Sequence, residues 1–226
     1  MFSNRNELVI AIAVGLFYTA IIGSIPLSVK IHSFDFLGGV LIPTGTILFS
    51  LSYLATDIIN ELSGRAAAFK LVLIGLFMRA FLALITVFSL SGEALPGISN
   101  AIFWSEDNNL AFVFVMGSSQ LIILGGIVGF AASSFVDVAI YSYLKSAHEN
   151  KNRLWLRNNL STMVAQAVGT TVFVMIAFSL RMPFEAMLPL ILGQIIFKCL
   201  FAVVDTPLLY IARNIAVGNK LLNFSG

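Results

Sequence analysis

Long apolar stretches separated by short polar connections run through the whole chain. A bilayer core about 30 Å thick needs about 20 apolar helical residues to cross it, and six stretches reach that length. None of them alternates apolar and polar residues as the strands of a membrane β-barrel do. The pattern therefore predicts an all-α membrane protein with six transmembrane helices, at Leu8–Leu27, Phe36–Leu62, Ala66–Leu90, Leu110–Leu144, Arg157–Leu180 and Ala186–Ala212.

Two of these stretches are longer than a simple span requires. As one helix, Leu110–Leu144 would be about 52 Å long, so it must tilt, kink near Gly125 and Gly126, or extend beyond the lipid. The first third of Phe36–Leu62 holds three glycines and Pro43. Proline removes a backbone donor and glycine loosens a helix, which favours either a broken or re-entrant start or an ordinary proline kink.

Composition narrows the class of protein. Of the 226 residues 58% are hydrophobic and 11% are charged, whereas a soluble domain carries about 25% charged residues. A soluble enzyme, a nucleic-acid-binding module and a disordered protein are excluded, and a net charge of +2 without a basic tail argues against nucleic acid as a partner. The short connections predict a single six-helix domain over residues 1–226, surrounded by lipid bilayer.

Metal and cofactor chemistry has no support in the sequence. Cys199 is the single cysteine, which excludes an internal disulfide and a cysteine metal site. His32 and His148 fall in connections on opposite sides of the membrane, and the acids do not have the spacing of a metal-binding motif. We expect neither a metal nor a cofactor.

The distribution of Lys and Arg predicts the orientation. With six spans, one side of the membrane holds nine cations and the other holds only Lys30 and Arg181. Cytoplasmic loops carry the excess of Lys and Arg, so both termini are expected in the cytoplasm. Trp104 and Trp155 fall at opposite ends of spans, where interface anchors belong.

Polar residues inside the spans are the candidate chemistry. Tyr53, Asp57 and Glu61 are four residues apart and share a helix face, and Gln194 and Lys198 repeat that spacing. An ionisable residue inside a membrane is expensive and usually pairs or serves a pathway. A solute-binding site explains so many internal charges better than packing does, because buried ion pairs add little stability. The predicted substrate-binding residues are Tyr53, Asp57, Asn60, Glu61, Arg79, Asp137, Arg157, Gln166, Phe173, Gln194, Lys198 and Asp205.

Other interpretations of these residues stay open. The charges can form a paired network that only locks the helices together, or the acids can reach the cytoplasmic headgroups. A row of small residues, Gly125, Gly129 and Ser133, leads to Asp137 on one face. Small residues let helices approach closely, so this face suits another helix or a homodimer contact.

Four motifs in order resemble the queuosine precursor transporter family, also called the vitamin uptake transporter family. They are the run from Tyr53 to Gly64 (YLATDIINELSG), the run from Ser133 to Asp137, the run from Trp155 to Thr162 with Gln166, and the segment from Lys198 to Pro207. The resemblance covers essentially the whole chain. One departure is Gly169-Thr170-Thr171, where family members often have Asp before the Thr. This departure is consistent with a shift in substrate preference, for instance toward queuine.

The resemblance implies a bacterial inner-membrane carrier, not an enzyme. It implies import of the 7-deazaguanine precursors of queuosine, such as 7-cyano-7-deazaguanine and 7-aminomethyl-7-deazaguanine, for salvage into tRNA. It also implies a fold like that of the substrate-binding subunits of energy-coupling-factor transporters. A guanine-like edge presents two donors that match a carboxylate, and its carbonyl accepts from Arg, Lys, Gln or Asn.

Three rival functions remain at this stage. The chain can be a substrate-binding subunit for another vitamin, which requires a separate ATPase and coupling protein. An intramembrane enzyme would use the acid cluster, although no nucleophile and base stand out as a pair. A purely structural membrane subunit would bind no ligand.

Overall fold

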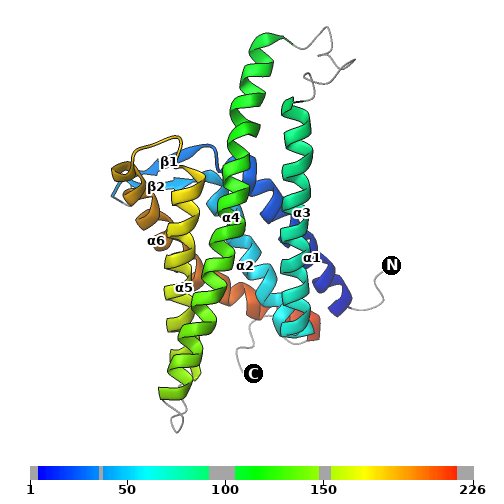
Figure 1. Ribbon diagram of the computed structural model, residues 1–226. Coiled ribbons are helices and arrows are strands. Elements are labelled where there is room, and N and C mark those ends of the chain that lie inside the picture. Colours follow the sequence, from blue (N-terminus) through cyan, green and yellow to red (C-terminus); the bar gives the residue numbers. More distant parts are fainter. Residues whose placement is uncertain (1–4, 36–37, 92–104, 148–153, 218–226) are drawn as a thin grey trace. The chain divides into compact units, whose positions relative to one another are not determined.

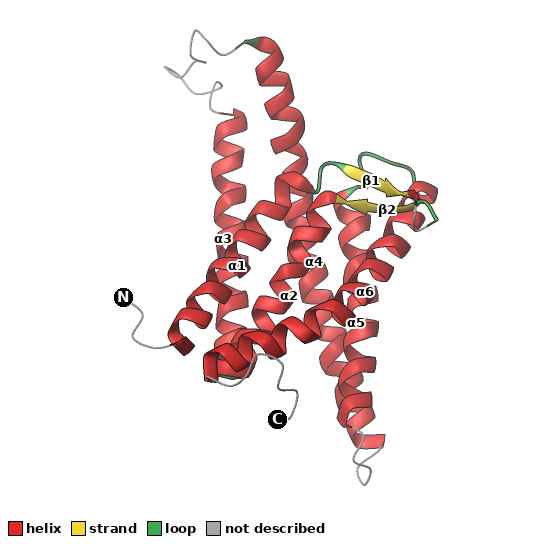
Figure 2. Cartoon of the chain, turned by 180° about the vertical axis from the view of Figure 1, so that it is seen from behind, coloured by secondary structure: helices red, strands yellow, loops and turns green. Residues whose placement is uncertain are grey.

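A computed structural model provides the structure of the chain and describes residues 5–35, 38–91, 105–147 and 154–217. Long helices make up nearly all of this part. The exception is one short two-stranded sheet, whose strands follow the first helix and precede the second along the chain (Figures 1 and 2). The elements are α1 Arg5–Leu27, β1 Ile31–Phe34, β2 Val40–Pro43, α2 Thr44–Ser63, α3 Arg65–Ser91, α4 Glu106–Ala147, α5 Leu154–Ala177 and α6 Phe184–Val217.

Each predicted apolar stretch contains one helix, and for all except the second the ends agree to within a few residues. The stretch around Gly125 and Gly126 belongs to one continuous helix, α4, whose 42 residues correspond to about 63 Å. Within the described residues, four helical segments are long and apolar enough to cross a membrane, at Arg5–Leu27, Ala66–Ser91, Glu106–Ser133 and Phe184–Phe201. The chain is thus a mostly helical membrane protein, and the count of six spans and the cytoplasmic termini stay predictions.

The predicted helix Phe36–Leu62 is wrong at its beginning. Val40–Pro43 is a strand paired with β1, and α2 begins only at Thr44 (Figure 2). Gly38 and Gly39 both have φ of +78°, a conformation that glycine adopts without strain and that helices exclude. The start of this stretch is therefore neither a proline kink nor a re-entrant helix, because strand pairing with β1 takes the place of helical hydrogen bonds.

Proline and a backbone hydrogen bond fix the point where α2 begins. Pro43 is extended, with φ −60° and ψ 135°, immediately before the first helical residue. The N–H of Thr44 donates to the carbonyl oxygen of Lys30 at 2.8 Å, and so does the Thr44 hydroxyl at 3.1 Å. These two hydrogen bonds join the beginning of α2 to the turn that follows α1.

The chain divides into two compact units. The first unit comprises Met1–His32, Pro43–Ser119 and Leu200–Gly226, and the second comprises Ser33–Ile42 and Gln120–Cys199. The long helices α4 and α6 are each divided between the two units, α4 after Ser119 and α6 after Cys199.

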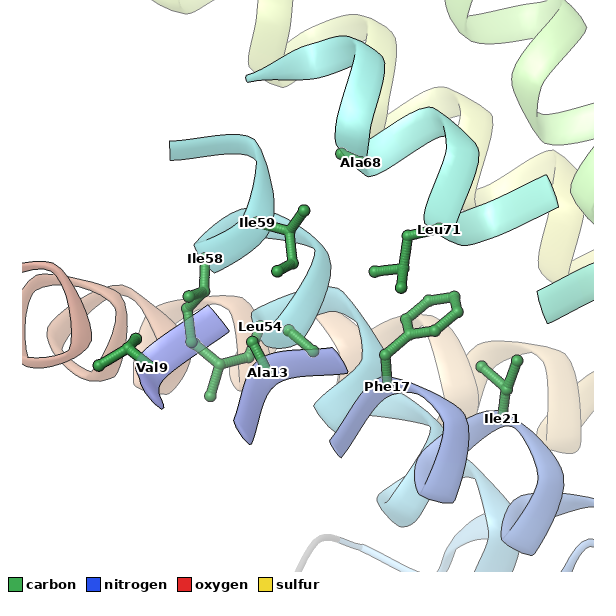
Figure 3. Close-up of a cluster of buried hydrophobic side chains, with 10 residues drawn as sticks. Val9, Ala13, Phe17, Ile21, Leu54, Ile58, Ile59, Ala68 and Leu71 are labelled. Carbon is green, nitrogen blue, oxygen red and sulfur yellow. The ribbon is translucent and has the colours of Figure 1, made fainter. Parts of the chain in front are cut away.

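Three helices build the core of the first unit (Figure 3). The buried face of α1 repeats every four residues, and α2 and α3 supply the facing side chains. Because lipid tails are as apolar as these side chains, contact between closely packed atoms rather than exclusion of water holds such helices together. The core residues are Val9, Ala13, Phe17, Ile21, Leu54, Ala55, Ile58, Ile59, Ala68 and Leu71.

Glycines set the helix packing of the second unit. A Cβ atom added to Gly129 would lie 2.8 Å from the carbonyl oxygen of Gly169, and one added to Gly125 would lie 2.9 Å from that of Phe173. Helices α4 and α5 therefore touch backbone to backbone, which confirms that the small-residue face of α4 admits another helix. Since α5 covers Gly125 and Gly129, a second chain cannot use these residues, and the homodimer stays a prediction without this surface.

Much of the described surface is apolar, as lipid contact requires. Helix α3 exposes large side chains over most of its length, whereas its buried positions are few. Single-sided burial of this kind is typical of a helix at the edge of a bundle in lipid. The most exposed of these side chains are Phe69, Phe77, Phe81, Leu84 and Phe88.

Candidate functional site

Arg79 is a buried cation in the first unit. It lies near the middle of α3, its residue surface is 6% exposed, and its guanidinium carbon Cζ is 5.6 Å from the ring centre of Phe49 on α2. The Phe49 ring meets the Tyr53 ring edge to face, with 5.5 Å between centroids. Helix α2 thus brings two aromatic rings, one turn apart, to the arginine.

Arg79 has no carboxylate partner among the residues that the structure describes. In the described part of the chain no acid lies within ion-pair distance of it, and its Nε atom has no hydrogen-bond acceptor. Attraction to an aromatic face contributes about 0.5–2 kcal/mol, which is less than the several kcal/mol that a buried charge costs. A cation in that position is suited to a ligand that supplies acceptors.

The polar face of α2 separates into two parts. Tyr53 is partly buried, while Asp57 and Asn60 are exposed. Oε1 of Glu61 forms an ion pair with Nε of Arg213 on α6 at 3.1 Å; the Glu61 side chain is 44% exposed and that of Arg213 is 37% exposed. The described role of Glu61 is therefore to connect the end of α2 with α6.

Lys198 is the corresponding cation of the second unit. Its Nζ atom, on α6, donates to Oγ1 of Thr170 on α5 at 2.7 Å, and Thr170 is 1% exposed. No further acceptor and no carboxylate lies within bonding distance of Lys198 among the described residues. A lysine ammonium has three donors, and Thr170 takes one of them among the described residues.

Further site residues of the second unit lie near this pair in sequence and on the same helices. Gln194 precedes Lys198 by one turn and is 2% exposed, and its Nε2 atom donates no hydrogen bond within the described part, although the residue takes part in another interaction. Gln166 precedes Thr170 by one turn and is partly buried. The Phe173 ring, on α5, meets that of Phe178 edge to face, with 6.2 Å between centroids.

Three predicted site residues cannot be placed. The side chains of Asp137, Arg157 and Asp205 lie outside the described residues. The structure brings Arg79 to Tyr53 and keeps Gln194 and Lys198 on one helix, but the convergence of all twelve residues on one site stays a prediction. Among the described residues, no group of three His, Cys, Asp or Glu side chains is arranged to hold a metal ion.

Two residues outside the predicted substrate-binding set now belong to the candidate site, and one of them, Thr170, lies in the segment where the sequence departs from the family motif. Phe49 lies one turn before Tyr53 and carries the guanidinium of Arg79. Thr170 lies one turn after Gln166 and holds the ammonium of Lys198. Extending each predicted polar face by four residues would have found both, because helix positions i and i+4 share a face.

The two groups share a chemical character. Each has a cation within an apolar helix that no acid neutralises in the part of the chain that is described, and the cation of the first group, Arg79, lies against an aromatic ring. Charged donors bind acceptor oxygens about twice as strongly as neutral donors do, and flat rings suit an apolar slot. The arrangement fits a planar ligand that presents carbonyl or similar acceptors.

Comparison with known proteins gives two matches. The family described as "Putative vitamin uptake transporter" matches residues 43–212, a range that begins one residue before α2. The chain is also 28% identical over 178 residues to the "Probable queuosine precursor transporter" of Bacillus subtilis (strain 168), covering 78% of this chain and 74% of that relative. No solved structure matches the chain.

Proposed function

The chain belongs to the vitamin uptake transporter family and is accordingly a multi-pass membrane transporter rather than an enzyme; from this premise we propose that it imports queuosine precursors. The proposed substrates are 7-cyano-7-deazaguanine, 7-aminomethyl-7-deazaguanine or queuine, taken up across the bacterial inner membrane for salvage into tRNA. The name of the Bacillus subtilis relative supports this class of substrate.

The observation that carries the proposal is a buried arginine on an aromatic face, with no acid paired to it among the described residues. Arg79 over Phe49 offers a planar donor group beside a flat apolar surface, and a 7-deazaguanine ring system is flat and has a carbonyl oxygen. The guanidinium donates to that oxygen while the ring system lies against aromatic side chains. Neither a structural scaffold nor a purely lipid-facing helix requires such a group.

Carboxylates complete the proposed recognition. The guanine-like edge carries adjacent N–H donors, which one carboxylate can accept as two parallel hydrogen bonds. Asp57 lies one turn after Tyr53 on α2 and is exposed, and we assign it this role, with Asp137 as the alternative. In the second unit, Lys198 and Gln194 on α6 and Gln166 and Phe173 on α5 are proposed substrate-binding residues, as are Asn60, Arg157 and Asp205. Glu61 forms the ion pair with Arg213.

The family description favours one second candidate. A vitamin uptake transporter can also be the substrate-binding subunit for another vitamin-like molecule, energised by a separate ATPase. The proposed orientation has both termini in the cytoplasm in either case. The two candidates differ in the ligand and in the need for a partner.

A binding panel on the detergent-purified protein distinguishes them. Melting temperature is measured with queuine, the two 7-deazaguanine precursors, guanine and a set of vitamins, for the wild-type protein and for Arg79→Met. We expect the 7-deazaguanines to raise the melting temperature of the wild type but not of the variant. Stabilisation by a vitamin and by none of the 7-deazaguanines would replace the main proposal with the second candidate.

A further inference from the structure

Packing of α3 on α1 fixes the backbone beneath Arg79. Gly75 lies one turn before Arg79 and therefore on the same face of α3. A Cβ atom added to Gly75 would lie 2.6 Å from Cδ1 of Ile21 and 2.8 Å from Cε1 of Phe17, both on α1. This close approach turns the Arg79 face of α3 toward the interior of the first unit, where Arg79 is 6% exposed. It places the backbone of Arg79 but does not by itself orient the guanidinium.

Phe49 on α2 supplies the contact that reaches the guanidinium. Cζ of Arg79 lies 5.6 Å from the centre of the Phe49 ring, within the range at which a ring face attracts a cation. Tyr53 meets the Phe49 ring edge to face, with 5.5 Å between centroids and 84° between ring planes. Among the described residues Nε of Arg79 has no hydrogen-bond acceptor. Within this part of the chain the ring is therefore the contact that orients the guanidinium.

A guanidinium held in this way binds a ligand more tightly than one that turns freely. A long arginine side chain loses rotamer freedom when it is fixed, and a ligand binds better when the protein has already fixed the group that it meets. The donors of a guanidinium lie in one rigid plane, so holding the plane also fixes the directions of its N–H groups. Because Arg79 and Tyr53 both pack on the Phe49 ring, little of its surface is left for a ligand.

We propose that Phe49 is a positioning residue: its ring orients the guanidinium of Arg79 toward the acceptor atoms of the substrate, and the ring itself does not contact the substrate. Tyr53 supports this role by holding the Phe49 ring. The inference rests on the proposed function, in which Arg79 donates to the substrate. It adds that the affinity for the substrate depends on Phe49 only through Arg79.

A double-mutant cycle on the detergent-purified protein tests this dependence. Isothermal titration calorimetry measures the affinity of the wild type, Phe49→Leu, Arg79→Met and the double variant. The ligand is whichever of 7-cyano-7-deazaguanine, 7-aminomethyl-7-deazaguanine and queuine the wild type binds most tightly. Leucine is apolar but has no ring, so Phe49→Leu should weaken binding about 2- to 30-fold where Arg79 is present, the range of a cation–π contact. Where Arg79 is already methionine, the further loss should be less than about twofold.

Two more variants control for the loss of an aromatic side chain. Phe81 lies two residues after Arg79 on α3 and is 56% exposed, so Phe81→Leu should leave the affinity unchanged. Phe49→Tyr keeps a ring face for the guanidinium and should bind within about twofold of the wild type. If Phe49→Leu protein is not recovered from the membrane, Phe49→Met takes its place in the cycle, because methionine lacks a ring and fills irregular apolar space.

The outcomes separate this inference from the proposed function. Equal weakening by Phe49→Leu with and without Arg79 would show that the ring contacts the substrate, and would overturn the inference. Full affinity in Phe49→Leu, or an equal loss in Phe49→Leu and Phe49→Tyr, would also overturn it, while weaker binding by Arg79→Met upholds the proposed function. Failure of the wild type to bind any of the three ligands would overturn the proposed function and this inference together.

Discussion

Replacing Arg79 with methionine should make the protein more stable or leave its stability unchanged, and at the same time abolish tight ligand binding. The arginine is 6% exposed and pairs with no acid in the described part of the chain. Methionine is flexible and similar in length, and it fills irregular apolar space well. The substitution therefore removes charge and donors while largely preserving the packing between α2 and α3.

The two effects have opposite signs and can be estimated separately. Exchanging a buried charged group for an apolar one of similar volume is neutral or stabilising by about 1–4 kcal/mol. The lost attraction to the Phe49 ring, 5.6 Å away, offsets about 0.5–2 kcal/mol of that. A lost hydrogen bond from a charged donor to the ligand costs about 1.5–3 kcal/mol, which weakens binding about tenfold to 150-fold.

Two measurements on the same protein preparations test the predicted effects of Arg79→Met on stability and on ligand affinity. Melting temperature without ligand reports stability, and calorimetric titration with 7-cyano-7-deazaguanine reports affinity. Lys70→Met is the control, because Lys70 is an exposed cation on the same helix and its loss should alter neither quantity appreciably. Arg79→Met protein that melts several degrees lower and binds the ligand normally would refute the reasoning and make Arg79 a structural residue.

Further variants test other parts of the account. Asp57→Asn should enter the membrane normally yet lower the queuosine content of tRNA at limiting external precursor. The reason is that an amide donor would face a ligand donor, at a cost of about 1–3 kcal/mol. Near-normal tRNA queuosine would instead make Asp137 the carboxylate that binds the guanine-like edge. Glu61→Arg should lower the melting temperature slightly and adding Arg213→Glu should restore it, since an exposed ion pair is worth about 0.2–1 kcal/mol; no recovery would show that the ion pair is not formed. Gly129→Ala should destabilise the protein by about 1–3 kcal/mol through overpacking, whereas Gly117→Ala, with open space around the added carbon, should not, and equal effects would contradict the α4–α5 contact.

The helices could be predicted closely because membrane spans are determined by local apolar length. The predicted Ala66–Leu90 and the observed α3, Arg65–Ser91, differ by one residue at each end. The beginning of α2 could not be predicted, because Val40–Pro43 is as apolar as the helix that follows it. Its strand structure depends on pairing with β1, a partner outside the local window.

The site was predictable in kind but not in its contacts. Cations inside apolar stretches identified Arg79 and Lys198, because such residues are rare without a function. Their partners, the Phe49 ring and the Thr170 hydroxyl, are an ordinary apolar residue and a small polar residue in sequence. Only the packing of α3 on α2 and of α6 on α5 reveals these roles.

The central claim is that the chain carries 7-deazaguanine precursors into the cell, and tRNA composition tests it most directly. Bacteria that can neither synthesise the precursor nor take it up would express the chain and receive 7-cyano-7-deazaguanine in the medium. The account predicts that queuosine returns to tRNA with the wild-type chain and not with Arg79→Met at equal amounts in the membrane. Absence of queuosine from tRNA with wild-type protein present in the membrane would contradict the claim.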